Sequence, residues 1–154
     1  MISKVKWIVN FCLLFTALYL PSVSWGQSLS LETLKQFSDH INEISSQTPV
    51  ELYPFLSDSL VVEVNLGSNA QGVSLNYDKQ EYMEMLEKLD AEGRYQKNIE
   101  NSEVHIYNHM INSPTSGQYS IVSYSKTTRV KAWVTVDVVI EGDKLKIIKL
   151  VEEM

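Results

Sequence analysis

The spacing of apolar positions changes along the chain, and the changes predict the order of its elements. Over residues 28–46 apolar side chains recur every third or fourth position, the period of an amphipathic helix. Ser30 is suited to cap its start and Pro49 to stop it. Over residues 60–66 apolar side chains instead occupy every second position, which predicts a strand with one buried face.

The rest of the chain predicts one more helix and then a series of strands. A loop with two glycines over residues 67–76 leads to a helix over residues 77–89, capped by Asn76 or Asp78. Beyond Gly93 all longer segments alternate as strands do, over residues 95–110, 119–128, 130–141 and 144–151. Gly142-Asp143 joins the last two as a tight hairpin turn.

Helices followed by antiparallel strands predict an α+β fold, with the N-terminal helices packed on a strongly curved antiparallel sheet. The clearest strand, residues 130–141, has one apolar face: Ala132, Val134, Val136, Val138 and Ile140. Its opposite face also carries large apolar side chains, Trp133 and Val139. Because an exposed apolar face invites a partner, we predict a homodimer interface at Trp133 and Val139.

The first 26 residues have the layout of a cleaved secretory signal. Two lysines precede a mostly apolar run over residues 7–20, and the small residues Ser24 and Gly26 follow. A membrane-spanning helix needs about 20 apolar residues, so this run is short for an anchor. We predict a signal peptide over residues 1–26 and a single domain over residues 27–154, with no membrane attachment after cleavage. We expect a periplasmic protein, with secretion as the alternative.

Composition narrows the classes of partner and cofactor. The formal net charge of −6 becomes −8 when Lys4 and Lys6 leave with the signal, and such a chain repels nucleic acid and anionic lipid. Cys12 leaves too, so the mature domain has no disulfide and no thiolate ligand. The chain has no phosphate-binding glycine loop, nucleophile elbow or dinucleotide fingerprint. We therefore predict no cofactor and no metal.

Three passages carry a resemblance to a known superfamily. They are Pro-Phe-Leu-Ser-Asp-Ser-Leu-Val-Val-Glu-Val over residues 54–64, Asp-Lys-Gln-Glu-Tyr over residues 78–82, and the closing hairpin over residues 136–147. With the order of elements, they resemble the nuclear-transport-factor-2-like superfamily, which includes SnoaL-like cyclases, ketosteroid isomerases and exported proteins of unassigned role. The resemblance implies a cone-shaped, cystatin-like fold over most of the mature chain. It implies no single function, because this fold hosts many.

Several side chains are candidates for a pocket inside such a cone. His40 lies on the apolar side of the first predicted helix, where an imidazole could move protons. We group it with three of the abundant tyrosines, Tyr53, Tyr82 and Tyr124, as predicted ligand-binding residues. The isomerases also need an aspartate facing the pocket, and Asp137 falls on the opposite face of its strand. We predict no catalytic residue.

A polar row is the other candidate site. Glu103, His105, Tyr107 and His109 alternate along one predicted strand and so share one face. Residues four apart on a strand are separated by about 13 Å, too far for one metal ion to bind both histidines. We interpret the row as a solvated polar face, which leaves open a site completed by neighbouring strands.

The favoured hypothesis is an exported protein that binds a small, partly apolar molecule inside the cone and does not catalyse a reaction. The first alternative is a cofactor-free cyclase, isomerase or dehydratase that uses His40 with one or two tyrosines. It requires His40 and a carboxylate to converge in one pocket. The second alternative is an inhibitor or immunity-type interaction module, which predicts a closed interior and an apolar patch around Trp133.

Overall fold

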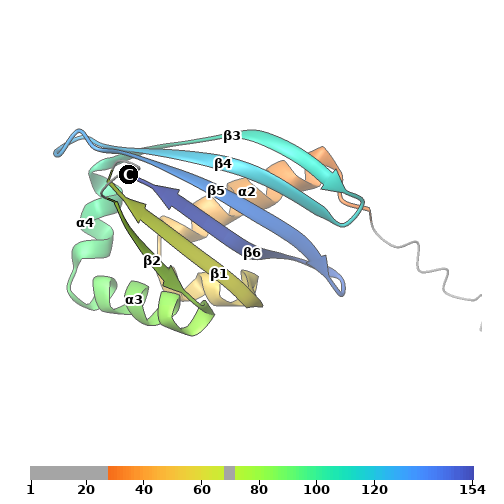
Figure 1. Cartoon of the computed structure of the whole chain (residues 1–154), viewed down its shortest axis with the longest axis horizontal. Helices are drawn as coiled ribbons and strands as arrows, with labels where there is room; N and C mark the ends of the chain where they lie inside the picture. The colour runs from red at the N-terminus through yellow and green to blue at the C-terminus, as the bar shows by residue number, and fades with distance from the viewer. Residues whose placement is uncertain (1–27, 68–71) are drawn as a thin grey trace, which may run out of the picture.

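One six-stranded sheet organises the chain in a computed structural model that describes residues 28–67 and 72–154 (Figure 1). The strands lie in the order β2-β1-β6-β5-β4-β3. Neighbours are antiparallel except β1 and β6, which run parallel. The strand bounds are β1 Leu56–Leu66, β2 Val73–Tyr77, β3 Ser102–Ser113, β4 Ser116–Ser125, β5 Lys131–Glu141 and β6 Lys144–Glu153.

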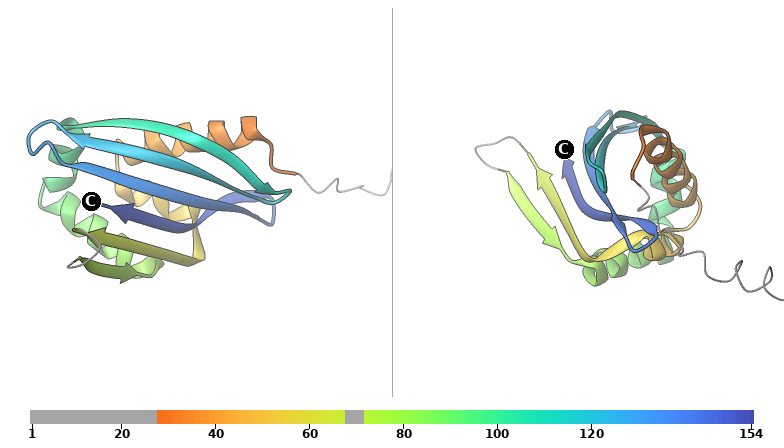
Figure 2. Two further views of the ribbon diagram at one scale, coloured as in Figure 1. Left: turned by 45° about the horizontal axis from the view of Figure 1, so that its top comes forward. Right: turned by 90° about the vertical axis from the view of Figure 1, so that its right-hand side faces the viewer.

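Helices cover one side of this bent sheet, so the fold is α+β as predicted (Figure 2). They are α2 Leu31–Ser45, the 3-10 helix η1 Pro49–Phe55, α3 Lys79–Ala91 and α4 Arg94–Glu100. The predicted caps are confirmed for both long helices: Ser30 accepts a hydrogen bond from the Thr33 amide, and Asp78 accepts one from the Glu81 amide. The predicted signal peptide lies outside the described residues.

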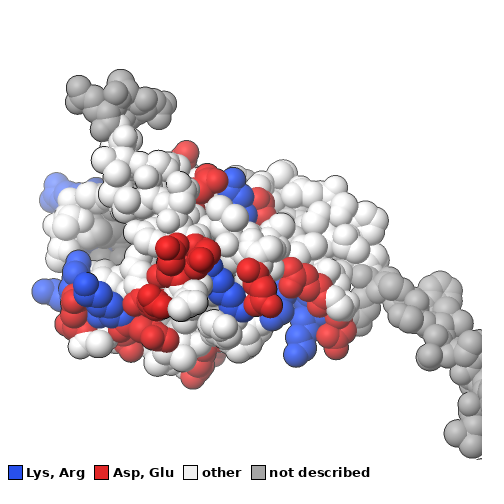
Figure 3. Space-filling model, turned by 60° about the horizontal axis from the view of Figure 1, so that its bottom comes forward, with Lys and Arg blue, Asp and Glu red and all other residues white. Residues whose placement is uncertain are grey.

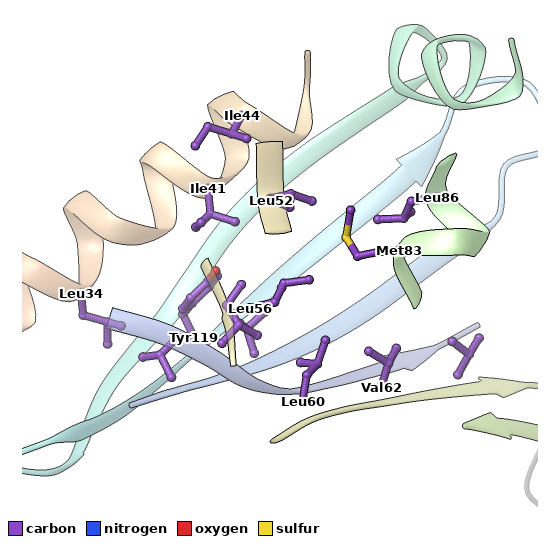
Figure 4. Close-up of a cluster of buried hydrophobic side chains, with 14 of the residues drawn as sticks. Leu34, Ile41, Ile44, Leu52, Leu56, Leu60, Val62, Met83, Leu86 and Tyr119 are labelled. Atoms are coloured by element: carbon purple, nitrogen blue, oxygen red, sulfur yellow. The ribbon is translucent and has the colours of Figure 1, made fainter. Parts of the chain in front are cut away.

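The core lies between the helices and the sheet (Figure 4). Leu34 of α2 is fully buried against the sheet, and the alternation of β5 places Val136 and Val138 there too. The predicted inner face of β5 is therefore confirmed. Trp133, on the opposite face, remains 47% exposed.

Gly117 lets α2 approach the sheet closely. A Cβ atom at this position would lie 2.9 Å from the carbonyl oxygen of Met110 and 3.0 Å from the side chains of Leu29 and Leu34. Real Cβ atoms rarely approach other atoms so closely. A residue without a Cβ atom is therefore needed at this position, and it allows the start of α2 to pack closely on β4.

Two elements differ from the sequence-based expectation. Part of the predicted loop over residues 67–76 is the edge strand β2, which pairs with β1. The start of the strand predicted over residues 95–110 is instead helix α4, which follows Gly93 in the left-handed conformation. Only two apolar side chains, Tyr95 and Ile99, mark the helical spacing of this short segment, and they fit an alternating pattern equally well.

A β-bulge in β3 divides the polar row predicted over residues 103–109. The pairing with β4 shifts between Tyr107 and Met110, and Asn108 has a φ of 53°. The extra residue reverses which face the following side chains occupy. The prediction that all four polar side chains share one face is therefore wrong, because His109 turns inward onto Tyr119 and α2.

Candidate functional site

A cavity of about 170 Å³ lies inside the fold, between the sheet and the helices. Side chains from α2, η1, α3 and four strands line it, and most are apolar. They are Ile41, Leu52, Leu56, Val62, Tyr82, Tyr119, Ile121, Val134, Val136, Ile147, Leu150 and Glu152. Three of these residues carry a polar group, which is the composition of a small-molecule site: apolar walls with a few oriented polar groups.

Tyr119 supplies the most unusual of the three polar groups. The side chain is 0% exposed, and its hydroxyl has no hydrogen-bond partner among the described residues. Figure 4 shows the hydroxyl oxygen among apolar side chains in the space between α2 and the sheet. Burial raises the pKa of Tyr119 above its ordinary value of 10, and negative charge on Tyr82 would raise it further. The phenol is therefore neutral and available as a hydrogen-bond donor.

Tyr82 of α3 and Glu152 of β6 are the other polar residues of the cavity. Burial raises the pKa of Tyr82, and negative charge on Tyr95 and Glu152 would raise it further. Burial also raises the pKa of Glu152 above its ordinary value of 4.5. Tyr82 and Glu152 line the same cavity, so negative charge on either group disfavours ionisation of the other.

Tyr95 of α4 is a further tyrosine near these polar residues. Its hydroxyl donates a hydrogen bond of 2.6 Å to the Ser45 carbonyl oxygen at the end of α2. Burial raises the pKa of Tyr95 to about 12, with a smaller contribution from Asp90. Tyr95 is therefore a structural neighbour of the cavity that ties α4 to α2.

His109 of β3 stacks on the ring of Tyr119. The two rings stack with centroids 5.8 Å apart and an interplanar angle of 20°. The His109 Nε2 atom lies 2.8 Å from the Ser38 hydroxyl, which donates its own proton to the Lys35 carbonyl oxygen. Nε2–H is therefore the donor in this arrangement. Burial lowers the pKa of His109, Lys35 lowers it further, and Asp39 raises it.

His40 lies outside the interior cavity. It is exposed and lines a separate open groove of about 680 Å³, at the end of the molecule formed by the start of α2, η1 and the β5–β6 turn. Its ring makes an edge contact with Phe55 at 5.4 Å. Neither cavity brings His40 together with Tyr53, Tyr82 or Tyr124. The groove does contain a carboxyl group, that of Asp143, but His40 is exposed and no tyrosine lines the groove, so the predicted His40–tyrosine site is not observed.

The predicted tyrosines are dispersed. Tyr82 lines the interior cavity, but Tyr53 is 52% exposed, with the Lys79 ammonium 4.1 Å from the centre of its ring. Tyr124 is half-buried and pairs with Glu103 and Lys131, on the sheet face away from Tyr119. That outer face also carries the predicted interface residue Trp133, whose ring meets Tyr107 edge-on at 6.2 Å. Val139 is half-buried on the same face.

Sequence reasoning missed Tyr119 and Glu152 for different reasons. Tyr119 and Ile121 are two residues apart on β4 and therefore share its inner face, so the inward position of Tyr119 could have been predicted. Glu152 could not, because β6 contains an extra residue between Ile147 and Lys149. Without that irregularity, counting from Ile147 would place Glu152 on the outer face.

Within residues 28–67 and 72–154, no three His, Cys, Asp or Glu side chains gather as a metal site would require. No helix in those ranges is long and apolar enough to cross a membrane.

Comparisons with known proteins identify the fold. No family model and no curated protein matches the chain. An NTF2-like protein of unknown function from Methylobacillus flagellatus matches at a TM-score of 0.58 and 13% identity, over 83% of this chain and 98% of its own. An NTF2-like protein of unknown function from Pseudomonas aeruginosa matches at 0.55 and 12%, over 77% and 95%.

A ketosteroid isomerase-like protein from Erwinia carotovora atroseptica matches at a TM-score of 0.50 and 10% identity, over 80% of this chain and 94% of its own. Likeness at such low identity is a likeness of fold, and it agrees with the curved sheet and the helices on its inner side. The chain has the nuclear-transport-factor-2-like fold.

Proposed function

We propose that this chain is a small-molecule-binding protein whose interior cavity holds a neutral, largely apolar group about the size of one aromatic ring. The observation that carries the proposal is the buried Tyr119 hydroxyl, which has no partner among the described residues and belongs to a side chain that lines an apolar cavity. Leaving a buried donor unpaired costs about 1–3 kcal/mol. A ligand that accepts this hydrogen bond removes the cost.

The volume of the cavity supports the size of the bound group. A buried apolar cavity of about 150 Å³ in another protein accommodates benzene. The cavity here, at about 170 Å³, is similar. A single ring with one small substituent therefore fits inside, whereas a fused polycyclic skeleton would need the walls to move.

The lining supports a neutral ligand. The walls around Tyr119 are apolar side chains such as Ile41 and Val136, so a buried formal charge would lose its hydration without compensation. Tyr119 offers a donor, which matches a carbonyl or ether oxygen. We infer an uncharged group with an acceptor directed at Tyr119.

Acetophenone and ethylbenzene form a probe pair that tests this proposal, because they have similar shapes and only acetophenone carries an acceptor. We expect both to bind in a calorimetric titration. The ratio of their affinities should fall by about 2- to 12-fold in Tyr119→Phe, the loss of one hydrogen bond worth ~0.5–1.5 kcal/mol. Tyr124→Phe, on the outer face, is the matched control and should leave the ratio unchanged. Failure of both probes to bind, or an unchanged ratio in Tyr119→Phe, would contradict the proposal.

A cofactor-free enzyme is the second candidate, and Glu152 is the observation that favours it. A carboxyl with a raised pKa beside phenols in an apolar cavity is a common feature of acid–base sites. Such a site would exchange the methyl protons of acetophenone with deuterium from D₂O, which NMR detects. Glu152→Gln would stop this exchange while acetophenone still bound. Exchange no faster than in buffer alone would remove the enzyme candidate.

Export and dimerisation are further parts of the proposal. Residues 1–26 would be removed as a signal, which the mass of the protein recovered from an exported fraction tests. The outer face of the sheet would form a homodimer, supported by the exposure of Trp133. Trp133→Lys should then convert a dimer to a monomer in sedimentation analysis. The interaction-module hypothesis predicts a closed interior, so the cavity favours ligand binding over it.

A further inference from the structure

A second hollow adjoins the interior cavity, and its lining has a different chemistry. It has a volume of about 550 Å³ and lies at the end of the sheet near α4 and the C-terminus. Figure 3 shows a hollow at this end of the molecule, at the left of the view. We call it the polar groove; its lining residues are Lys97, Asn98, Asn101, Ser102, Ser123, Ser125, Thr127, Thr128, Val130, Ala132, Glu152 and Met154.

Glu152 connects the polar groove with the interior cavity, because it lines both. In the sheet register Tyr119 pairs with Val136, whereas Glu152 pairs with Val134, two residues nearer the groove. At 3.3 Å per residue this displacement is about 7 Å along the strands. Tyr119 therefore lies farther from the groove than Glu152, and Glu152 lies between the two hollows.

Several polar groups of the groove remain available for a ligand. Asn101 and Ser102 donate hydrogen bonds to carbonyl oxygens within α4, and the Ser125 hydroxyl pairs with Thr127. By contrast, no side-chain hydrogen bond or ion pair within residues 28–67 and 72–154 engages the Lys97 ammonium, the Asn98 amide or the Ser123 hydroxyl. These three groups come from α4 and β4, on two sides of the hollow.

The chemistry of these groups selects the kind of molecule that fits. An ammonium only donates, a carboxylate only accepts, and amides and hydroxyls do both. Adjacent hydroxyl groups on a sugar or polyol also donate and accept, so they can satisfy such a mixed set. An anionic head group fits poorly, because Glu152 lies in the groove and the whole chain carries a net charge of −6.

We propose that the polar groove binds a neutral, hydroxyl-rich head group of the same ligand whose apolar ring occupies the interior cavity. The ligand class is then an aryl glycoside or an aryl ether of a polyol, with its ring directed at Tyr119 and its hydroxyl groups between α4 and β4. This inference rests on the proposed function of the interior cavity and extends it by naming the second half of the ligand.

Affinity follows from joining the two halves. Once the ring is bound, the attached head group reaches the groove at a high effective concentration, so its weak contacts add to the affinity. The probe is 4-acetylphenyl β-D-glucoside, compared in calorimetric titrations with 4-hydroxyacetophenone, which has the ring and carbonyl without the sugar. We expect the glucoside to bind at least ~10-fold more tightly, and glucose alone to bind far more weakly than either.

Variants of the groove separate the two binding regions. Asn98→Ala and Ser123→Ala should each reduce the glucoside affinity about 3- to 10-fold, the loss of one or two hydrogen bonds, and leave 4-hydroxyacetophenone unaffected. Glu100→Ala on α4 and Ser120→Ala on β4 are matched controls outside the groove and should change neither affinity. Tyr119→Phe should weaken both probes.

The outcomes distinguish this inference from the proposed function. If 4-hydroxyacetophenone binds and depends on Tyr119, but the glucoside binds no more tightly, the interior site stands and the head-group inference is overturned. A tighter glucoside whose affinity is unchanged in Asn98→Ala and Ser123→Ala would overturn it as well. If neither probe binds, the proposed function itself fails.

Discussion

Replacing Tyr119 by phenylalanine should stabilise the ligand-free protein, which is the reverse of what most substitutions in a core do. The change removes only the hydroxyl, so the ring still packs against α2 and stacks on His109. The hydroxyl is fully buried and has no partner in the described part of the chain. Its loss therefore removes a desolvation cost and breaks no hydrogen bond.

The size of the effect follows from that cost, about 1–3 kcal/mol for a buried unpaired polar group. For a domain of this length, each kcal/mol corresponds to a rise of roughly 2–8 °C in the melting temperature. We expect the free energy of unfolding of Tyr119→Phe to exceed that of the wild type by this amount.

Equilibrium unfolding in urea, followed by circular dichroism, measures the difference directly. An unchanged slope against urea concentration shows that the folded and unfolded states expose the same area as before. Tyr124→Phe, at a half-buried position on the outer face, should change the free energy by no more than ~0.5 kcal/mol. A loss of stability in Tyr119→Phe would refute the reasoning, because it would mean that the hydroxyl already has a stabilising partner in the ligand-free protein.

Three other predictions concern packing and pH. Gly117→Ala should lower the free energy of unfolding by about 1–3 kcal/mol in the same assay, since its Cβ would lie 2.9 Å from the Met110 carbonyl; unchanged stability would show that α2 can shift at no cost. His109 has a lowered pKa in the folded state, so as the pH drops below about 6.5 the unfolded state takes up the proton more readily and the free energy of unfolding should fall. His109→Gln should flatten this fall. A pH profile of stability identical to that of the wild type would contradict the prediction. Glu152 has a raised pKa in the folded state, so its contribution to the free energy of unfolding should decline as the pH rises above about 4.5. Glu152→Gln should remove this decline. A pH profile of stability identical to that of the wild type would contradict the prediction.

The sequence predicts the parts of the fold that have a long, regular pattern. The period of residues 28–46 identifies α2, and the alternation of β5 places Val136 and Val138 in the core. Short elements are not predicted because they contain too few residues to show a period. Strand β2 has five residues and α4 has seven, and their packing rather than their sequence decides their conformation.

The site is harder to predict than the fold because irregular pairing determines it. Single extra residues in β3 and β6 reverse the side-chain alternation, bringing His109 behind Tyr119 and Glu152 into the cavity. Conversely, His40 occurs at an apolar spacing on its helix, yet it lies in a separate groove beside Phe55, because it is at the side of the buried stripe of α2, whereas the next residue, Ile41, lines the cavity. Local pattern does not show which residues at the border of an apolar stripe are covered by the rest of the fold.

A crystal structure of the protein soaked with acetophenone tests the central claim most directly. The account predicts one molecule in the interior cavity, its ring between α2 and the sheet and its oxygen within hydrogen-bonding distance of the Tyr119 hydroxyl. Acetophenone bound only in the groove beside His40, with the cavity beside Tyr119 unchanged, would contradict the claim that this fold binds its ligand inside.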